Sequence, residues 1–257
     1  MSKDILSAQG LYKSYGSIAV LKDVTIRMKQ GETHAVIGPN GAGKTTLFKT
    51  LSGEVLPDAG SIAIDGRQVE ATDGYQRVRM GVGRTFQVAR VFGEDTVLSN
   101  MVVAVEARRR QQGQLGMFSL RISPSAQVYS EAMDALQKMG LASQCDRMAG
   151  VLAYGDRKRL ELAMSLALQP KLLMLDEPMA GMSPSDRTAA VETIKAVVKE
   201  RGISVLLTEH DMDVVFALAD HITVLNYGEI IASGTPEEVR ASSRVREVYL
   251  GHEVQHA

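Results

Sequence analysis

The sequence lacks several features that mark whole classes of protein. Its only cysteine, Cys145, excludes an internal disulfide and a cysteine-rich metal site, and we expect it to be a small, partly buried apolar residue. A net charge of −1 gives no general attraction to nucleic acid or anionic lipid, so we expect no nucleic-acid partner. No segment approaches the length of an apolar membrane span, and 45% hydrophobic with 23% charged residues is typical of a soluble globular protein.

Targeting and repeat signals are also missing. Residues 1–5 lack the charged-then-apolar pattern of a signal peptide, so we expect a cytoplasmic protein that is free to dock onto a membrane protein. The chain shows no internal repeat, low-complexity tract or obvious linker, and its 257 residues suit one α/β domain or two small ones.

What is present begins with the stretch GPNGAGKTT at residues 38–46, which matches the phosphate-binding pattern G-x-x-x-x-G-K-[ST] without a mismatch. Glycines let backbone N–H groups turn toward one anion, and a following helix adds its positive end. Lys44 can place its ammonium on the β- and γ-phosphates, and the Thr45 hydroxyl can ligate Mg²⁺. A Gly-rich turn could match by chance, but an apolar run before it and helix-compatible residues after it favour a nucleoside triphosphate site. The residues expected to bind the nucleotide here are Gly38, Asn40, Gly41, Ala42, Gly43, Lys44, Thr45 and Thr46.

Strand-like segments lie on both sides of the middle of the chain. Near-continuous apolar runs at residues 171–175 and 204–208 predict strands buried on both faces of a parallel sheet. Residues 5–30 predict short strands joined by a turn. Residues 18–21 and 24–28 carry the β-branched and alternating residues of such strands, and residues 29–32 are expected to turn between elements.

Between about residues 88 and 168 the character changes to helix. Apolar residues recur at helical spacing over residues 126–139, in a methionine stripe that we interpret as core packing. We interpret residues 108–110, three consecutive arginines, as a solvated helix face. The pattern therefore predicts a parallel α/β core interrupted by a helical insertion.

Polar residues follow several of the predicted strands and turns. Asp176 and Glu177 end a buried strand. Acidic residues at a strand end are common and often have no function. Downstream of a phosphate loop, however, Asp176 would orient the Mg²⁺ shell and Glu177 would act as general base. Gln87, after a Gly-rich turn, and His210, after an apolar strand, would each by itself be a surface or structural residue. Gly155, near a helix start, marks either a turn or a second anion-binding helix terminus.

The order of these motifs resembles that of the ATP-binding-cassette (ABC) ATPase family over nearly the whole chain. The resemblance implies an α/β P-loop NTPase (RecA-like) core with an N-terminal antiparallel β subdomain and an inserted α-helical subdomain. It implies that Gln87 reaches the Mg²⁺ and the transport partner, that His210 contacts the γ-phosphate, and that Tyr15 stacks on adenine. Residues 152–156 correspond to the signature motif, in which Ala153, Tyr154 and Gly155 contact the ATP of a second subunit. The catalytic residues implied are Lys44, Gln87, Glu177 and His210, and the metal ligands are Thr45, Gln87 and Asp176.

Three stretches, at residues 84–92, 152–156 and 176–182, are similar to the ATPase subunits of branched-chain amino acid uptake systems, as is the ending from residue 225. Two positions depart from the family pattern. Ala153 stands where Ser is commonest, which removes one hydroxyl donor to the γ-phosphate, and Ser183 stands where many relatives have Asp.

The resemblance also implies an organisation and partners. The chain would be a single ABC ATPase domain over residues 1–257, with a core of approximately 1–87 and 166–257 and a helical subdomain of approximately 88–165. Two subunits, identical or siblings, would enclose ATP and Mg²⁺ head to tail, beside integral membrane permeases on the inner face of the cell membrane and, indirectly, a periplasmic solute-binding protein. The alternatives left open are export of lipid or lipopolysaccharide, and a soluble ABC ATPase that acts on a protein partner.

Overall fold

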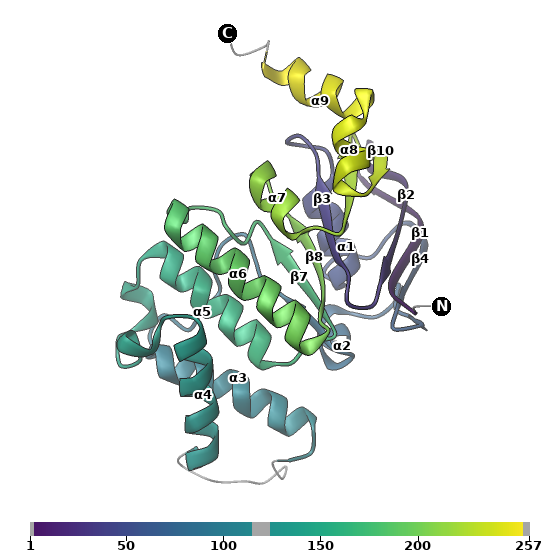
Figure 1. Cartoon of the computed structure of the whole chain (residues 1–257). Coiled ribbons are helices and arrows are strands. Elements are labelled where there is room, and N and C mark those ends of the chain that lie inside the picture. Colours follow the sequence, from purple (N-terminus) through teal and green to yellow (C-terminus); the bar gives the residue numbers. More distant parts are fainter. Residues whose placement is uncertain (1–2, 115–123, 254–257) are drawn as a thin grey trace.

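The computed structural model describes residues 3–114 and 124–253, and its larger sheet forms the centre of the molecule (Figure 1). This sheet has the strand order β10-β9-β3-β8-β7-β6; its pairs are parallel except for β10, which is antiparallel to β9. Every residue of β3, β7 and β8 is buried, which confirms that the apolar runs form strands covered on both faces. The strands are β3 (Thr33–Ile37), β6 (Val82–Arg84), β7 (Leu172–Asp176), β8 (Ser204–Thr208), β9 (His221–Asn226) and β10 (Glu229–Gly234).

The smaller sheet is antiparallel and comes from the N-terminal part of the chain, in the order β2-β1-β4-β5. Its strands are β1 (Asp4–Tyr15), β2 (Ile18–Lys29), β4 (Ala59–Ile64) and β5 (Arg67–Gln68). The expectation of short strands was wrong, because β1 and β2 each have 12 residues. β2 continues through Asp23, at φ +56°, because a register shift between Leu11 and Lys13 absorbs the irregularity without ending the pairing.

The helices pack around these sheets, with α6 and α7 on one face of the larger sheet and α3 and α4 at the far end from the smaller sheet (Figure 1). They are α1 (Lys44–Ser52), α2 (Gly74–Arg79), α3 (Val97–Gln111), α4 (Ala126–Lys138), α5 (Tyr154–Ala167), α6 (Pro184–Arg201), α7 (Met212–Leu218), α8 (Pro236–Ala241) and α9 (Ser243–Glu253). Among the described residues, no helix combines the length and apolarity that crossing a bilayer requires.

Two apolar clusters hold the layers together. In the first, Leu47, Phe48 and Leu51 of α1 pack with residues of both sheets, so α1 lies between them. In the second, the opposite face of the larger sheet packs against helices α3 to α7. Alternate residues of one strand serve the two clusters: Val36 of β3 joins the first, and Ala35 and Ile37 join the second. The helix that starts at the phosphate loop is therefore packed between the two sheets.

The region from residue 88 to 168 is less uniformly helical than its sequence predicts. Residues 85–96 form no helix, and η1 (Ala142–Gln144) and η2 (Ala149–Val151) are single turns between α4 and α5. The Gly-rich turn expected before Gln87 is shorter than predicted: Met80 and Gly81 form a turn, with Gly81 at φ +97°, but Val82 and Gly83 pair with β7 as part of edge strand β6.

Two predictions about side chains in this region can be compared with the structure. Val128, Ala132 and Leu136 on α4 are buried, which confirms core packing for the middle of the stripe, and Cys145 is partly buried against the same cluster as predicted. The solvated arginine face is wrong for two of its three members. Arg109 is buried, and Arg108 and Arg109 both form ion pairs with Glu131 of α4, because α3 and α4 pack side by side.

Candidate nucleotide-binding site

The phosphate loop runs from the end of β3 into α1, and its glycines are required by the backbone. At Gly38 a Cβ atom would lie 2.0 Å from the carbonyl oxygen of Leu225, so no side chain fits there. Gly41 and Gly43 have φ values of +79° and +106°, in the left-handed region, and Gly43 is the N-cap of α1. A helix that begins in this way presents free backbone N–H groups and a positive end toward the loop.

Lys44 is the first residue of α1, and its buried side chain bends back across the loop. The ammonium donates to the carbonyl oxygens of Gly38 (2.6 Å) and Pro39 (3.1 Å). Burial lowers the pKa of Lys44, while the charges of Glu177 and Asp176 oppose this shift. The structure thus brings the predicted lysine and both predicted carboxylates into one electrostatic site.

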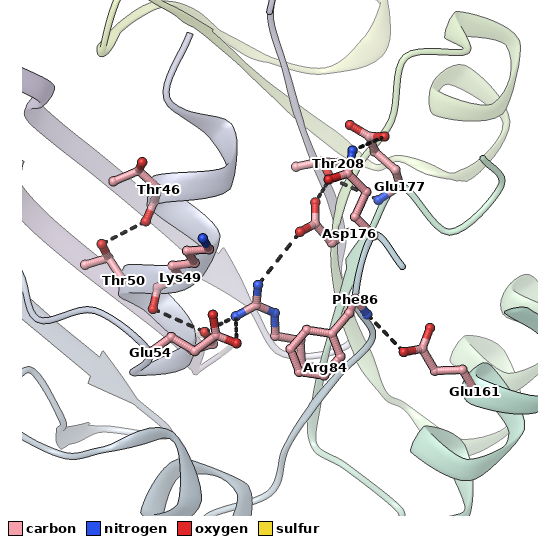
Figure 2. Close-up of polar contacts among 12 residues, drawn as sticks. Thr46, Lys49, Thr50, Glu54, Arg84, Phe86, Glu161, Asp176, Glu177 and Thr208 are labelled. Carbon is pink, nitrogen blue, oxygen red and sulfur yellow. Dashed lines mark hydrogen bonds and ion pairs between the residues drawn. The ribbon is translucent and has the colours of Figure 1, made fainter. Parts of the chain in front are cut away.

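The two carboxylates stand at the end of β7, where the neighbouring strand β8 also ends (Figure 2). Asp176 is buried and accepts a hydrogen bond from the Thr208 hydroxyl at 2.9 Å. Glu177 has a φ of +48°, and its N–H donates to both the carbonyl oxygen (3.1 Å) and the hydroxyl oxygen (3.2 Å) of Thr208. Such a backbone conformation persists only where the surroundings hold it, and Thr208 does so here. Thr208 was not predicted from the sequence; its position at the end of a buried strand was the available signal.

The side chain of Glu177 connects three segments that are far apart in the sequence. One carboxylate oxygen lies 2.8 Å from Nε2 of His210, and the other accepts a hydrogen bond from the Gln87 side-chain amide at 3.2 Å. The structure therefore brings Gln87, Glu177 and His210 together, although each of Gln87 and His210 alone carried a weak signal. A carboxylate placed in this way can accept a proton, and the two neighbours fix its orientation.

The start of α5 lies against the Gln87 segment. The Tyr154 hydroxyl donates to the carbonyl oxygen of Gln87 at 3.0 Å, and its ring covers Gly181, where a Cβ atom would lie 2.8 Å from the ring. Ala153 is the N-cap of α5 and makes no side-chain cap hydrogen bond. Gly155 follows within the first turn, so this helix terminus offers backbone N–H groups rather than a hydroxyl.

Tyr15 ends β1 and is partly exposed, with the Lys13 ammonium 5.7 Å from its ring centroid. Its ring face can stack on a planar group. Thr45 is exposed on the first turn of α1, next to Lys44, and Thr46 follows on the same turn. Asn40 lies in the loop between Gly38 and Gly41.

Two buried charged residues of α5, Lys158 and Glu161, hold the backbone on both sides of Gln87 and were missed by the sequence prediction. The Lys158 ammonium donates to the carbonyl oxygen of Phe86 at 2.7 Å. One oxygen of Glu161 accepts from the N–H groups of Phe86 (3.3 Å) and Arg90 (2.9 Å). Burial lowers the pKa of Lys158 and raises that of Glu161. Their signal was a pair of opposite charges three residues apart on an otherwise apolar helix face.

Glu209 supports the other side of the site and was also missed. It lies directly after β8 in the sequence, and its side chain is buried. The carboxylate accepts hydrogen bonds from the N–H groups of Met179 (2.8 Å) and His210 (3.2 Å). Burial raises the pKa of Glu209. This carboxylate ties the loop after Glu177 to the segment that carries His210.

The donors at the site suit Mg²⁺ chemically. The Thr45 hydroxyl, the Asp176 carboxylate and the Gln87 amide are oxygen ligands, which this hard cation prefers. Within residues 3–114 and 124–253, no group of three or more His, Cys, Asp or Glu side chains could hold a metal ion. A cation at this site would therefore depend on phosphate oxygens and water for its remaining ligands, as Mg²⁺ commonly does.

Known proteins are similar to this chain over nearly its full length. The chain is 40% identical to the high-affinity branched-chain amino acid transport ATP-binding protein LivG of Salmonella typhimurium, over 98% of this chain and 99% of that protein. It is 38% identical to BraF of Pseudomonas aeruginosa, which has the same description, over 98% and 99%. It is 34% identical to the lipopolysaccharide export system ATP-binding protein LptB of Haemophilus influenzae, over 97% and 98%.

Solved structures and family models agree with these relatives. The crystal structure of the ADP conformation of MJ1267, an ATP-binding cassette of an ABC transporter, matches with a TM-score of 0.83 at 28% identity, over 97% of this chain and 100% of that one. The likeness confirms the predicted P-loop NTPase fold class. A model described as ABC transporter matches residues 21–180, and one described as branched-chain amino acid ATP-binding cassette transporter matches residues 229–255. The chain therefore belongs to the ABC transporter family, among its ATP-binding proteins.

Proposed function

We propose that the chain is the ATP-hydrolysing subunit of a membrane transporter that imports branched-chain amino acids. One observation carries the chemistry: the Glu177 carboxylate is held between His210 and Gln87 at the strand end that also carries Asp176, and the charges of both carboxylates act on the buried Lys44. The identity with LivG and BraF supports the solute class, because both are named as branched-chain amino acid transport proteins.

In the proposed complex, the chain's own residues hold the nucleotide by charge and shape. Lys44 exchanges the carbonyl oxygens of Gly38 and Pro39 for the β- and γ-phosphates, and the N–H groups of the loop and of α1 surround the same anion. Tyr15 stacks on the adenine ring. Thr45 and Asp176, with Gln87, hold Mg²⁺, which when bound neutralises phosphate charge.

Hydrolysis then needs a base that is oriented before water attacks. Glu177 accepts the proton of the attacking water, and its contact with His210 fixes the carboxylate toward the γ-phosphate side. Gln87 holds the second carboxylate oxygen, so a movement of the Gln87 segment changes the orientation of the base. That link gives a membrane partner a route to the reaction.

The chain carries one phosphate loop and one signature stretch, so we propose that two subunits complete each site. The start of α5, with Ala153, Tyr154 and Gly155, would face the ATP held by the partner, which is either a second copy or a sibling ATPase. Negative charge on ATP attracts the positive end of that helix, and cleavage weakens the attraction. ATP thus acts as a ligand that favours the closed pair.

We further propose that residues 88–165 form the helical subdomain and that residues 1–87 and 166–257 form the core. A permease segment at the inner face of the cell membrane would bind beside Gln87, where the subdomain meets the core, and a periplasmic solute-binding protein would deliver the amino acid outside. The exposed apolar side chains of Val88 and Phe92, directly after Gln87, support a protein contact there.

The test compares wild-type protein with Glu177→Gln and with the exposed-residue control Glu192→Gln. We expect Glu177→Gln to bind MgATP, to lose nearly all ATPase activity, and to run as a dimer in size-exclusion chromatography with saturating MgATP. Glu192→Gln should behave as wild type, since the Glu192 carboxylate is exposed on the surface of α6 and pairs there with Lys195. An active Glu177→Gln variant would contradict the base, and a variant that stays monomeric would contradict the closed pair for the isolated chain.

The similarity to LptB favours a second candidate, an ATPase for lipopolysaccharide export. Lower identity to LptB than to LivG, and the match of residues 229–255, make import the stronger proposal. Deletion of the gene should abolish uptake of labelled leucine and leave the outer surface lipid unchanged. A normal uptake rate would overturn the solute, and failure to co-purify with any integral membrane protein would favour a soluble ATPase with a protein partner.

A further inference from the structure

Arg84 ends strand β6 and lies between the end of α1 and the carboxylates of the site (Figure 2). One guanidinium nitrogen forms an ion pair with the Glu54 carboxylate at 2.8 Å and donates a hydrogen bond to the Ser52 hydroxyl. The other terminal nitrogen lies 3.8 Å from Oδ2 of Asp176. One rigid fork therefore faces two carboxylates, and it pairs closely with only one of them.

The surroundings restrict where this guanidinium can go. The Arg84 side chain is 8% exposed, and the Phe86 ring lies 5.0 Å from its central carbon. Arg90 covers the same ring at 3.7 Å, and Glu161 holds the N–H of Phe86. Because the ring is fixed, Arg84 can shift in the plane between Glu54 and Asp176 but has little freedom elsewhere.

The two carboxylates differ in what else they contact. Oδ1 of Asp176 is held by Thr208, which leaves Oδ2 facing Arg84. Asp176 is 8% exposed, whereas the side chain of Glu54, directly beyond α1, is 35% exposed. A cation that moves toward Oδ2 of Asp176 competes with any metal ion for that oxygen and repels the ion. The hold of Glu54 on Arg84 therefore bears on the metal site.

We propose that Arg84 is a positioning residue that sets the Mg²⁺ affinity of the Asp176 site, and that Glu54 keeps this affinity high by drawing the guanidinium away from Asp176. The proposal deepens the proposed ATPase function and rests on it. Loss of the Glu54 charge lets Arg84 pair with Asp176 and weakens Mg²⁺ binding. Loss of the Arg84 charge removes the competitor, so Glu54 then has no influence on the metal.

The experiment measures Mg²⁺ dependence without turnover. In a Glu177→Gln background, binding of a fluorescent ATP analogue is followed in EDTA and then during titration with Mg²⁺. We expect Glu54→Gln to raise the half-saturating Mg²⁺ concentration about fivefold and to leave the affinity in EDTA unchanged. Arg84→Gln should lower the half-saturating Mg²⁺ concentration below that of the Glu177→Gln parent. In the Arg84→Gln background, Glu54→Gln should not change this concentration further. Glu229→Gln, at an exposed carboxylate that pairs loosely with Lys22, is the matched control and should change nothing.

Comparison of the two backgrounds shows whether Glu54 affects Mg²⁺ binding through Arg84. An equal effect of Glu54→Gln with and without Arg84, or no effect in either background, overturns the proposal. If Arg84→Gln fails to fold by circular dichroism, Arg84→Met replaces it: this neutral side chain brings no charge toward Asp176, so it too should remove the effect of Glu54→Gln. If the parent protein binds no ATP analogue, or binds it without regard to Mg²⁺, the proposed function itself fails. If the parent binds the analogue in a Mg²⁺-dependent way but the variants do not change the half-saturating Mg²⁺ concentration, only the role of Arg84 is contradicted.

Discussion

The starts of α1 and α5 are two helix termini that offer N–H groups to an anion, and they are built in opposite ways. At α1, three glycines and Lys44 form the terminus within a few residues, directly after a buried strand. At α5, Ala153 supplies no cap, and the helix start is held by Tyr154 against the Gln87 segment. The first terminus is specified by local sequence, and the second depends on contacts with residues far away in the chain. Substitutions in and around the two helices test this difference.

The largest effect is expected at the locally specified terminus. Lys44→Ala should weaken MgATP binding by about 100-fold, because a charge-assisted contact to phosphate is worth up to about 3 kcal/mol. Isothermal titration calorimetry measures this. Lys49→Ala, a lysine on the same helix outside the loop, is the control and should bind normally. Full affinity in Lys44→Ala would mean that the loop does not bind the triphosphate.

A second large effect is expected where α5 depends on tertiary contacts. Lys158→Met should lower the free energy of unfolding by about 3 kcal/mol at neutral pH, because it leaves Glu161 buried without its cation and the Phe86 carbonyl unpaired. Burial already holds the folded-state pKa of Glu161 above 4.5, so this group contributes most stability below that pH and loses it as the pH rises through the folded value. The deficit of Lys158→Met, measured by urea unfolding, should therefore shrink toward acid pH. A deficit that is independent of pH would contradict this explanation.

A smaller effect is expected at the contact between α5 and Gln87. Tyr154→Phe removes one hydrogen bond of 3.0 Å, worth about 1 kcal/mol, so kcat should fall by about fivefold while the affinity for ATP stays unchanged. Steady-state ATPase kinetics separate the two quantities. Tyr129→Phe, on the exposed face of α4, is the control. A change in affinity instead of kcat would show that Tyr154 acts on nucleotide binding and not through the Gln87 segment.

The smallest expected effect is a gain in stability. Ala153→Ser gives α5 the capping hydroxyl that it lacks and should stabilise the protein by about 1 kcal/mol. Ser183→Ala is the inverse change, because Ser183 caps α6 through the N–H of Asp186 at 3.2 Å, and it should cost a similar amount. Thermal unfolding of both variants checks the pair. Equal and opposite shifts would show that α5 lacks only a local cap, and no gain from Ala153→Ser would show that tertiary contacts already satisfy its N–H groups.

Prediction from the sequence succeeded where one short segment carries both the pattern and the physical reason. The phosphate loop, the buried strands β7 and β8, and the pair Asp176 and Glu177 at a strand end are of this kind. It failed at Arg108 and Arg109, because their partner Glu131 lies on another helix, and at β6, because a three-residue edge strand has too few residues to show a pattern. It did not find Arg84, Lys158, Glu161, Thr208 or Glu209, which act through contacts made only in the folded chain.

The loop that turns backbone N–H groups toward an anion, its lysine and the two carboxylates could be identified without coordinates, because glycine conformation, charge and strand burial are local properties. The meeting of Gln87 and His210 at Glu177, and the position of Arg84 between Glu54 and Asp176, follow only from how the chain folds. Hydrogen bonds and ion pairs act over a few ångströms, and residues tens of positions apart reach that distance only when the parallel strands align their ends at one edge of the sheet.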